Sequence, residues 1–305
     1  MTNGPAPPAR RNHPLTLAAG AGLIFLFGGR AQSDIKNDHW TQHPKTGEWS
    51  KVSPAGPRPD PRFGHEAFWD SARGRLIVTL GQQGSTFYND VWAFDPATVT
   101  WREISGSGDR PQTRYGAGGV HDAAGNRFLI THGFTNQGRF DDTWAFDLSA
   151  DAWSKTATSG PVPLKRCLAR SAWDPAGGRL FLYGGQSNDA PFHGDQWALA
   201  VSAGAWTELE PAASPGLRNL YGASFHTTIR RWYVVGGNTP QGRVNDAWAF
   251  DAAQGTWAPV EVGLNAPSAR QGHDLTGAEG TFYLFGGHDG SSELADTWAL
   301  RIEPA

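Results

Sequence analysis

The sequence is short of several features, and each shortage excludes a class of protein. It has one cysteine, Cys167, so no disulfide framework can form within the chain. Charged residues make up only 18% of it and the formal net charge is −3, so it carries no basic field for nucleic acid or anionic membranes. Local metal motifs, such as His-x-His or a Cys-His cluster, are also missing from the sequence. We therefore expect no metal ion and no cofactor.

Long apolar runs are missing too. The stretch from Leu15 to Phe27 is too short to cross a bilayer as a helix. Two arginines precede it and small residues follow it, which resembles a secretory signal. The repeat described below places the same residues in two strands of its first unit, so we expect a cytoplasmic protein, although the composition leaves secretion open.

What the chain does have is a repeat. A tryptophan preceded by Asp-x recurs with steps of 52, 52, 53, 51 and 50 residues, and an arginine recurs with five steps of 52. The Asp-x-Trp pairs are Asp38/Trp40, Asp90/Trp92, Asp142/Trp144, Asp195/Trp197, Asp246/Trp248 and Asp296/Trp298. The arginines are Arg10, Arg62, Arg114, Arg166, Arg218 and Arg270. A second tryptophan follows about nine residues later in five units, at Trp49, Trp101, Trp153, Trp206 and Trp257.

Each unit reads as four short strands. In the second unit these are Phe63 to Trp69, the apolar run Arg75 to Leu80, "VWAFD" and "TWREI". Six such units predict an all-β fold, a six-bladed β-propeller of four-stranded antiparallel blades. We expect one domain over residues 1–305, with blades at roughly 10–53, 62–105, 114–157, 166–210, 218–261 and 270–303.

The last unit is shorter than the others. It stops at "WALRIEPA", without a fourth strand or a second tryptophan, so we expect a last blade of three strands with Trp298 near an exposed edge. Pro5, Pro7 and Pro8 lack the N–H groups that a closing strand from the N-terminus would need. Such an open edge could pair with a second chain and give a dimer.

These columns resemble the kelch repeat. The carrying motifs are a Gly-Gly after an apolar strand, then Asp-x-Trp and a second Trp, with "RFGH" and "RQGH" opening two of the units. The resemblance covers about residues 10–300. It implies a kelch propeller that binds peptides or small substrates at one mouth of its central channel, with some arginines of the repeated column in contact.

The repeated aspartates and tryptophans are expected to be frame. One Asp per blade is not a catalytic pair, and it can accept hydrogen bonds from backbone N–H groups of the preceding loop. The tryptophans would fill the wedges between blades. His13, His65 and His273 share one repeat position, which also indicates a scaffold role.

The arginine column allows two interpretations. Six guanidinium groups could rim the mouth and bind an anionic ligand, or each could bond backbone carbonyls of the neighbouring blade. The loops between the second and third strands differ from blade to blade, as specificity loops do. Their candidate ligand-binding residues are Gln82, Gln83, Phe134, Asn136, Gln186, Asn188, Asn238 and His288.

The predicted function is therefore binding of an anionic or polar small molecule or a peptide at an arginine-rimmed mouth, with no nucleic-acid or membrane partner. The alternative is a small-molecule enzyme at the same mouth, such as a sugar isomerase or mutarotase, or a natural-product pathway enzyme. Glu66, Arg170 and Asp274 share an inner-strand position and are the catalytic candidates. A strongly shifted pKa among them would favour the enzyme, whereas a wide basic rim would favour the peptide binder.

Overall fold

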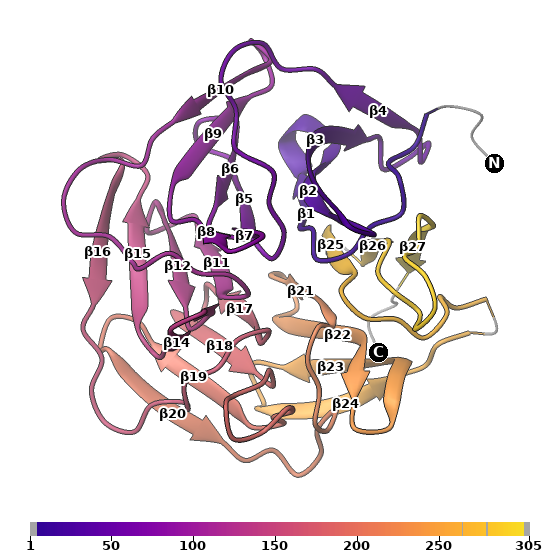
Figure 1. The fold of residues 1–305 in the computed structure, drawn as a ribbon. Coiled ribbons are helices and arrows are strands. Elements are labelled where there is room, and N and C mark those ends of the chain that lie inside the picture. The colour runs from indigo at the N-terminus through magenta and orange to yellow at the C-terminus, as the bar shows by residue number, and fades with distance from the viewer. Residues whose placement is uncertain (1–4, 264, 279, 302–305) are drawn as a thin grey trace.

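The computed structural model describes residues 5–263, 265–278 and 280–301 of the chain. Six antiparallel sheets stand around a central channel, in chain order (Figure 1). This arrangement confirms the predicted propeller. Five sheets have four strands and the sixth has three, as the missing last tryptophan predicts. Residues 5–8 lie outside the strands, so this part of the N-terminal segment does not extend the last blade.

The blades follow the chain in order, and their strands have the following bounds. Blade 1 holds β1 (Leu15–Ala18), β2 (Leu23–Ala31), β3 (Asp34–Gln42) and β4 (Trp49–Val52). Blade 2 holds β5 (Glu66–Asp70), β6 (Arg75–Thr79), β9 (Val91–Asp95) and β10 (Thr100–Glu103). Blade 3 holds β11 (Gly118–Asp122), β12 (Arg127–Thr131), β15 (Thr143–Asp147) and β16 (Ala152–Thr156).

Blade 4 holds β17 (Arg170–Asp174), β18 (Arg179–Tyr183), β19 (Gln196–Ala200) and β20 (Ala205–Leu209). Blade 5 holds β21 (Gly222–His226), β22 (Arg231–Thr239), β23 (Gly242–Asp251) and β24 (Thr256–Val260). Blade 6 holds β25 (Asp274–Ala278), β26 (Thr281–Phe285) and β27 (Thr297–Arg301). The only described helix is a single 3-10 turn, η1 (Ala19–Ala21), so no described helix reaches the length and apolarity of a membrane span.

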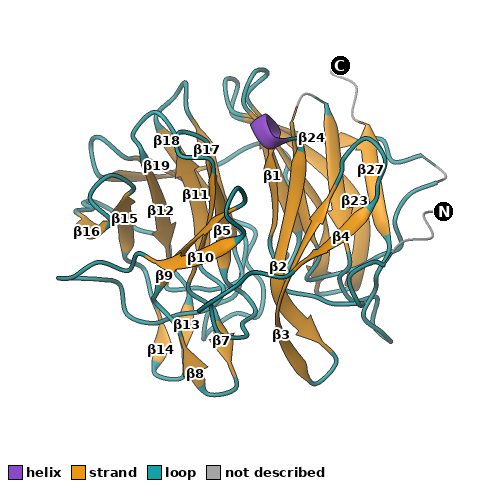
Figure 2. Cartoon of the chain, turned by 90° about the horizontal axis from the view of Figure 1, so that it is seen from above, coloured by secondary structure: helices purple, strands orange, loops and turns teal. Residues whose placement is uncertain are grey.

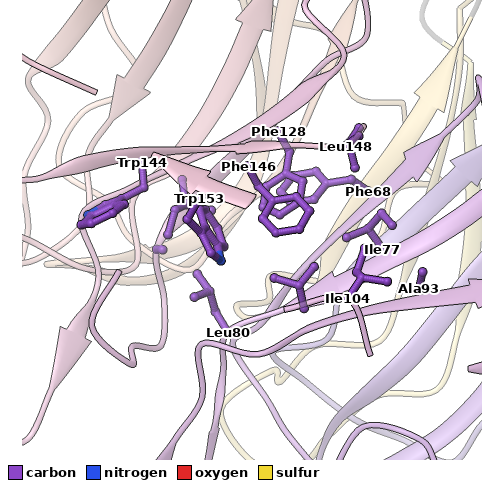
Figure 3. Packing of buried hydrophobic residues seen from close by; sticks show 13 residues of the cluster. Phe68, Ile77, Leu80, Ala93, Ile104, Phe128, Trp144, Phe146, Leu148 and Trp153 are labelled. Atoms are coloured by element: carbon purple, nitrogen blue, oxygen red, sulfur yellow. The ribbon is translucent and has the colours of Figure 1, made fainter. Parts of the chain in front are cut away.

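The core lies between neighbouring blades, because the second strand of each blade is apolar on both faces. Between blades 2 and 3, for example, Phe68 stacks on Phe128 with ring centroids 4.9 Å apart, and Trp153 meets Phe128 edge-on (Figure 3). The tryptophans of the second column are 3–7% exposed, so they fill the wedges as predicted.

The ring closes through backbone hydrogen bonds that repeat at every junction. The residue two positions after each column arginine has a left-handed φ of 54–66°, and its N–H donates to the same position of the preceding blade. These residues are Asn12, Gly64, Gly116, Leu168, Leu220 and Gly272. The N–H of Asn12 donates to Gly272 O at 2.6 Å. The junction between blades 6 and 1 is therefore made by the same hydrogen bond as the junctions between blades that follow one another in the chain. Glycine fills three of the six positions because this φ is unfavourable for other residues.

The two faces of the ring differ (Figure 2). On one face the loops between second and third strands project as hairpins, either as separate pairs or as extensions of the blade strands. The separate pairs are β7 (Gln82–Gln83) with β8 (Thr86–Phe87) and β13 (Phe134–Thr135) with β14 (Gly138–Arg139). We call this face the mouth. Helix η1 lies on the opposite face.

Candidate functional site

The six column arginines lie inside the blades and not on the mouth. Each is no more than 2% exposed and pairs in bidentate fashion with the Asp of the Asp-x-Trp motif of its own blade. In blade 2, Arg62 Nη1 donates to Asp90 Oδ1 at 2.6 Å and Nη2 donates to Oδ2 at 2.8 Å. Arg62 Nη1 also donates to Leu80 O at 3.0 Å, and Nε donates to Asp60 O at 3.1 Å. The geometry supports the structural interpretation, with carbonyls of the same blade in place of the neighbouring one.

The aspartate column is frame, but its partners differ from those expected. Each carboxylate accepts hydrogen bonds from the column arginine and from the indole N–H of its own motif. In blade 3, for example, Arg114 Nη1 donates to Asp142 Oδ1 and Trp144 Nε1 donates to Asp142 Oδ2 at 2.7 Å. The expected donors were backbone N–H groups of the preceding loop. Burial works to raise the pKa of Asp142, but the hydrogen bond and charge of Arg114 outweigh it and hold that pKa below its usual value. The expected rim of exposed guanidinium groups from this column is therefore not present on the mouth.

The mouth is ringed by the neighbours of the two repeated positions. In every blade the residue after the column arginine forms a β-bridge with the residue after the glycine that ends the apolar run. The resulting pairs are Arg11/Arg30, Phe63/Gln82, Tyr115/Phe134, Cys167/Gln186, Asn219/Asn238 and Gln271/His288. This ring contains five of the predicted loop residues, namely Gln82, Phe134, Gln186, Asn238 and His288. The first member of each pair was not predicted from the sequence. These residues differ from blade to blade although they directly follow the repeated arginine, and this variation could have marked them as surface residues.

The remaining predicted loop residues lie farther out on the hairpins. Gln83 accepts a hydrogen bond from the Tyr88 hydroxyl at 3.0 Å. Asn136 belongs to the tip of the β13–β14 hairpin, and Asn188 accepts a hydrogen bond from Arg139. Gln83 and Asn188 are thus engaged in contacts within the mouth loops.

Four other arginines lie at the mouth. Arg11 forms an ion pair with Glu293 at 3.5 Å, and 24% of its side chain is exposed. Arg30 donates to the carbonyl of its own loop, and Arg139 lies 5.3 Å from the ring centroid of Phe134. Arg243 approaches Gly290 in the loop of the next blade. Across the described ranges, no carboxylate lies within ion-pair distance of Arg30, Arg139 or Arg243.

Tyr115 joins the aromatic part of the mouth to three of these arginines. Its ring packs against Phe63 at 5.4 Å and against Phe134 at 6.3 Å. Burial raises the pKa of its hydroxyl, and the charges of Arg11, Arg139 and Arg30 all act to lower it. Guanidinium groups from blades 1 and 3 are therefore directed toward one half-buried phenol.

Below the mouth, the catalytic candidates meet in the channel. They come from the first strands of alternate blades, β5, β17 and β25. Arg170 Nη2 lies 3.1 Å from Asp274 Oδ1, and the N–H of Leu15 donates to Asp274 Oδ2 at 2.7 Å. Glu66 packs its carboxylate over Gly119, where a Cβ atom would come within 2.6 Å of Oε2. The intervening blades place Pro14, Gly118 and Gly222 at the same position, which leaves room for the three charged side chains.

This cluster divides the channel. Glu66 and Arg170 line both a 40 Å³ cavity on the mouth side and a 450 Å³ cavity that extends toward the opposite face. The larger cavity is also lined by Trp69, Trp173 and Phe225. Burial raises the pKa of Glu66 to about 8, with Arg170 opposing the rise and Asp274 adding to it.

The histidines do not gather into a site. His13, His65 and His273 are buried between blades, where desolvation, followed by the nearby column arginines, lowers their pKa values. His132 is also buried, and it bonds Thr131 within blade 3. Among the residues that the structure describes, no group of three or more His, Cys, Asp or Glu side chains could hold a metal ion.

The fold and its paired columns define a six-bladed propeller of repeated Arg–Asp–Trp units. A family model, the KLHDC2/KLHL20/DRC7 Kelch-repeats domain, matches residues 1–173 and 125–304. The chain therefore belongs to the kelch-repeat family.

Three relatives show how far the similarity extends. The Leucine-zipper-like transcriptional regulator 1 homolog of Drosophila melanogaster is 25% identical over 310 residues, covering 94% of this chain and 30% of the relative. Host cell factor of Drosophila melanogaster is 25% identical over 309 residues, covering 92% of this chain and 18% of the relative. Host cell factor 1 of Homo sapiens is 28% identical over 262 residues, covering 78% and 12%. The chain thus spans less than a third of the length of these relatives.

Proposed function

We propose that this chain is a binding module that takes an acidic segment of a partner protein at its mouth. The observation that carries the proposal is the set of mouth arginines that have no carboxylate partner among the described residues, Arg30, Arg139 and Arg243. The aromatic rings of Tyr115 and Phe134 lie on the same face, and Arg139 stands over the ring of Phe134. Guanidinium groups bind carboxylates through two parallel hydrogen bonds. The projecting hairpins surround this region and differ in sequence, as a surface that selects one partner requires.

Aromatic and amide groups complete the proposed surface. Phe63, Phe87 and Phe134 are half-buried, and Phe87 lies 6.0 Å from Phe134. Aromatic and arginine side chains are the residue types that carry most binding energy at protein interfaces. Gln82, Gln186 and Asn238 can pair with the backbone of an extended segment, since amides both donate and accept.

The test uses a fluorescein-labelled hexaglutamate peptide, measured by fluorescence anisotropy against the intact chain. We expect saturable binding that hexalysine does not reproduce. Replacing Arg30 and Arg139 with Gln should weaken binding by about tenfold or more for each lost charge-assisted bond. Arg102→Gln is the matched control, because Arg102 lies on the outer strand β10 with 67% of its side chain exposed. Equal affinity of the double variant, or equal binding of hexalysine, would rule out the proposal.

A second candidate function is favoured by Glu66 alone. A carboxyl group with a pKa of about 8 in a cavity can exchange a proton at neutral pH, which an isomerase or mutarotase needs. The 450 Å³ cavity has the size of a small-ligand site. A panel of neutral and acidic monosaccharides, screened by thermal shift and polarimetry, tests this role. A sugar that stabilises the wild type but not Glu66→Gln would support it, and a complete lack of stabilisation would oppose it.

A further inference from the structure

Among the residues that the structure describes, blade 6 has no counterpart of one strand that the other five blades share. In blades 1–5 a fourth strand carries a tryptophan, and each of these tryptophans is 3–7% exposed. The third strand places a large apolar residue directly opposite it in blades 2–5, as Trp101 pairs with Phe94 and Trp257 with Phe250. These opposing residues, which are Phe94, Phe146, Leu199 and Phe250, are at most 1% exposed.

Each of these tryptophans packs against the preceding blade. Trp101 meets Phe27 of blade 1 at 5.2 Å, and Trp257 meets Tyr183 of blade 4 at 5.4 Å. The indole N–H of Trp257 donates to Gln196 of blade 4 at 2.6 Å. The fourth strand is therefore part of the joint between two blades and not only the edge of one.

At the joint between blades 5 and 6 this filling is missing from the described residues. Leu300 occupies the position opposite the absent tryptophan, and it is half-buried where its counterparts are fully buried. A groove of 490 Å³ lies beside this position, on the face of blade 5 that is turned toward blade 6. It is lined by Tyr233 of β22, Ala249 of β23, Ala258 and Val260 of β24 and Arg301 of β27, and Leu300 stands next to it without lining it. The groove beside β10 reaches only strand β10 and nearby turn residues, with no second- or third-strand residue in its lining.

We propose that this groove and the outer edge of β27, with which no described strand pairs, accept an extended strand from a second protein, added antiparallel to β27. The incoming strand would place an aromatic side chain, by preference an indole, beside Leu300 and against the face of blade 5. Backbone hydrogen bonds to the edge would supply affinity, and the pocket for the alternate side chain would supply specificity. This site is separate from the mouth and does not depend on the function proposed there.

A second copy of the chain is a poor occupant of the groove. Its own edge strand is β27, whose Trp298 already donates to Asp296 at 2.6 Å and packs on its own blade 5. Pairing two β27 edges would therefore leave no free indole for either groove. The groove carries both signs of charge, from Arg231, Arg301, Asp251 and Glu261, so the aromatic residue decides the choice of partner more than net charge does.

The experiment uses peptides copied from the chain's own fourth strand in blade 4. A fluorescein-labelled peptide of the sequence GAWTELE, residues 204–210, is titrated into the intact chain. We expect saturable binding, at least tenfold weaker when the peptide's tryptophan is replaced by alanine. Ala258→Arg, which fills the groove from an exposed position, should weaken binding to a similar degree. Thr207→Arg, at the matching exposed position of blade 4, should leave it unchanged.

Two further measurements keep the proposal falsifiable. Hydrogen exchange should show that the peptide protects the amides of residues 297–301. Protection confined to the mouth hairpins, or equal binding by Ala258→Arg, would overturn the proposal and would leave the mouth function untouched. Sedimentation should show a monomer without peptide, because a dimer that dissociates when the peptide is added would mean that a second copy occupies the edge.

Discussion

Arg10 and Arg11 are neighbours in the sequence and have the same side chain, yet they belong to different parts of the molecule. Arg10 is fully buried and bonds both oxygens of Asp38, the carbonyl of Gly28 and that of Pro8. Arg11 lies in the mouth ring, and its ion pair with Glu293 is partly exposed. Side chains of successive residues in an extended segment point to opposite sides, so Arg10 points into the blade and Arg11 points to the surface of the mouth.

The largest expected effect on stability comes from replacing each of these two arginines in turn. Arg10→Ala leaves the buried side of Asp38 without its cation and should lower the free energy of unfolding by about 3–5 kcal/mol. Arg11→Ala removes a partly exposed pair and should cost about 1 kcal/mol or less. Chemical denaturation of the two variants measures both values. Similar losses for the two would mean that the buried column does not hold the blades together.

The sequence is informative about the frame because the same contacts are needed in every blade. The column arginines and their aspartates are separated by 26–29 residues in all six units, and this joint recurrence of opposite charges could have predicted their pairing. The side-chain direction could not be read from the period alone. For that reason the column arginines were predicted to rim the mouth, whereas the variable residues that follow them, such as Arg11, Tyr115 and Gln271, were not predicted to lie there.

The mouth and channel were harder to predict, because their residues do not recur in every blade. Arg139 and Arg243 share one loop position, within the sequence "QGR", whereas Arg30 stands at the start of its loop, and the hairpin geometry brings all three to one face. Glu66, Arg170 and Asp274 could be named from the sequence because they share one position of the first strand. Their meeting across the channel depends on Pro14 and on the glycines between them, since larger side chains there would occupy the space.

The next effect concerns a buried charge that does not repeat. The raised pKa of Glu66 means that the folded state keeps a proton that the unfolded state loses between the ordinary value of 4.5 and about 8. Its contribution to stability therefore falls as pH rises through this window, by up to about 1.4 kcal/mol per pH unit. Denaturation at pH 5, 6.5 and 8 should give a flatter dependence for Glu66→Gln. Glu208→Gln, at an exposed site, should keep the wild-type slope.

The smallest effect sharpens the contrast between buried and exposed arginines without any mutation. Raising NaCl from about 0.05 to 0.5 M shortens the screening length, which weakens exposed charges far more than buried pairs. Hexaglutamate binding should fall roughly tenfold, while Tm should change by less than about 2 °C. Anisotropy and calorimetry on the same samples test both parts. A large fall in Tm would mean that salt screens the column pairs, and would contradict their burial.

The ring of backbone hydrogen bonds through Asn12, Gly64, Gly116, Leu168, Leu220 and Gly272 has a consequence for the order of the blades. The same hydrogen bond forms at the junction between the last and first blades as at every other junction. The geometry therefore does not require a particular blade to come first. A circular permutant opened between blades 2 and 3, within residues 105–113, would retain every bond of this ring, because none of its six donors or acceptors lies in that segment.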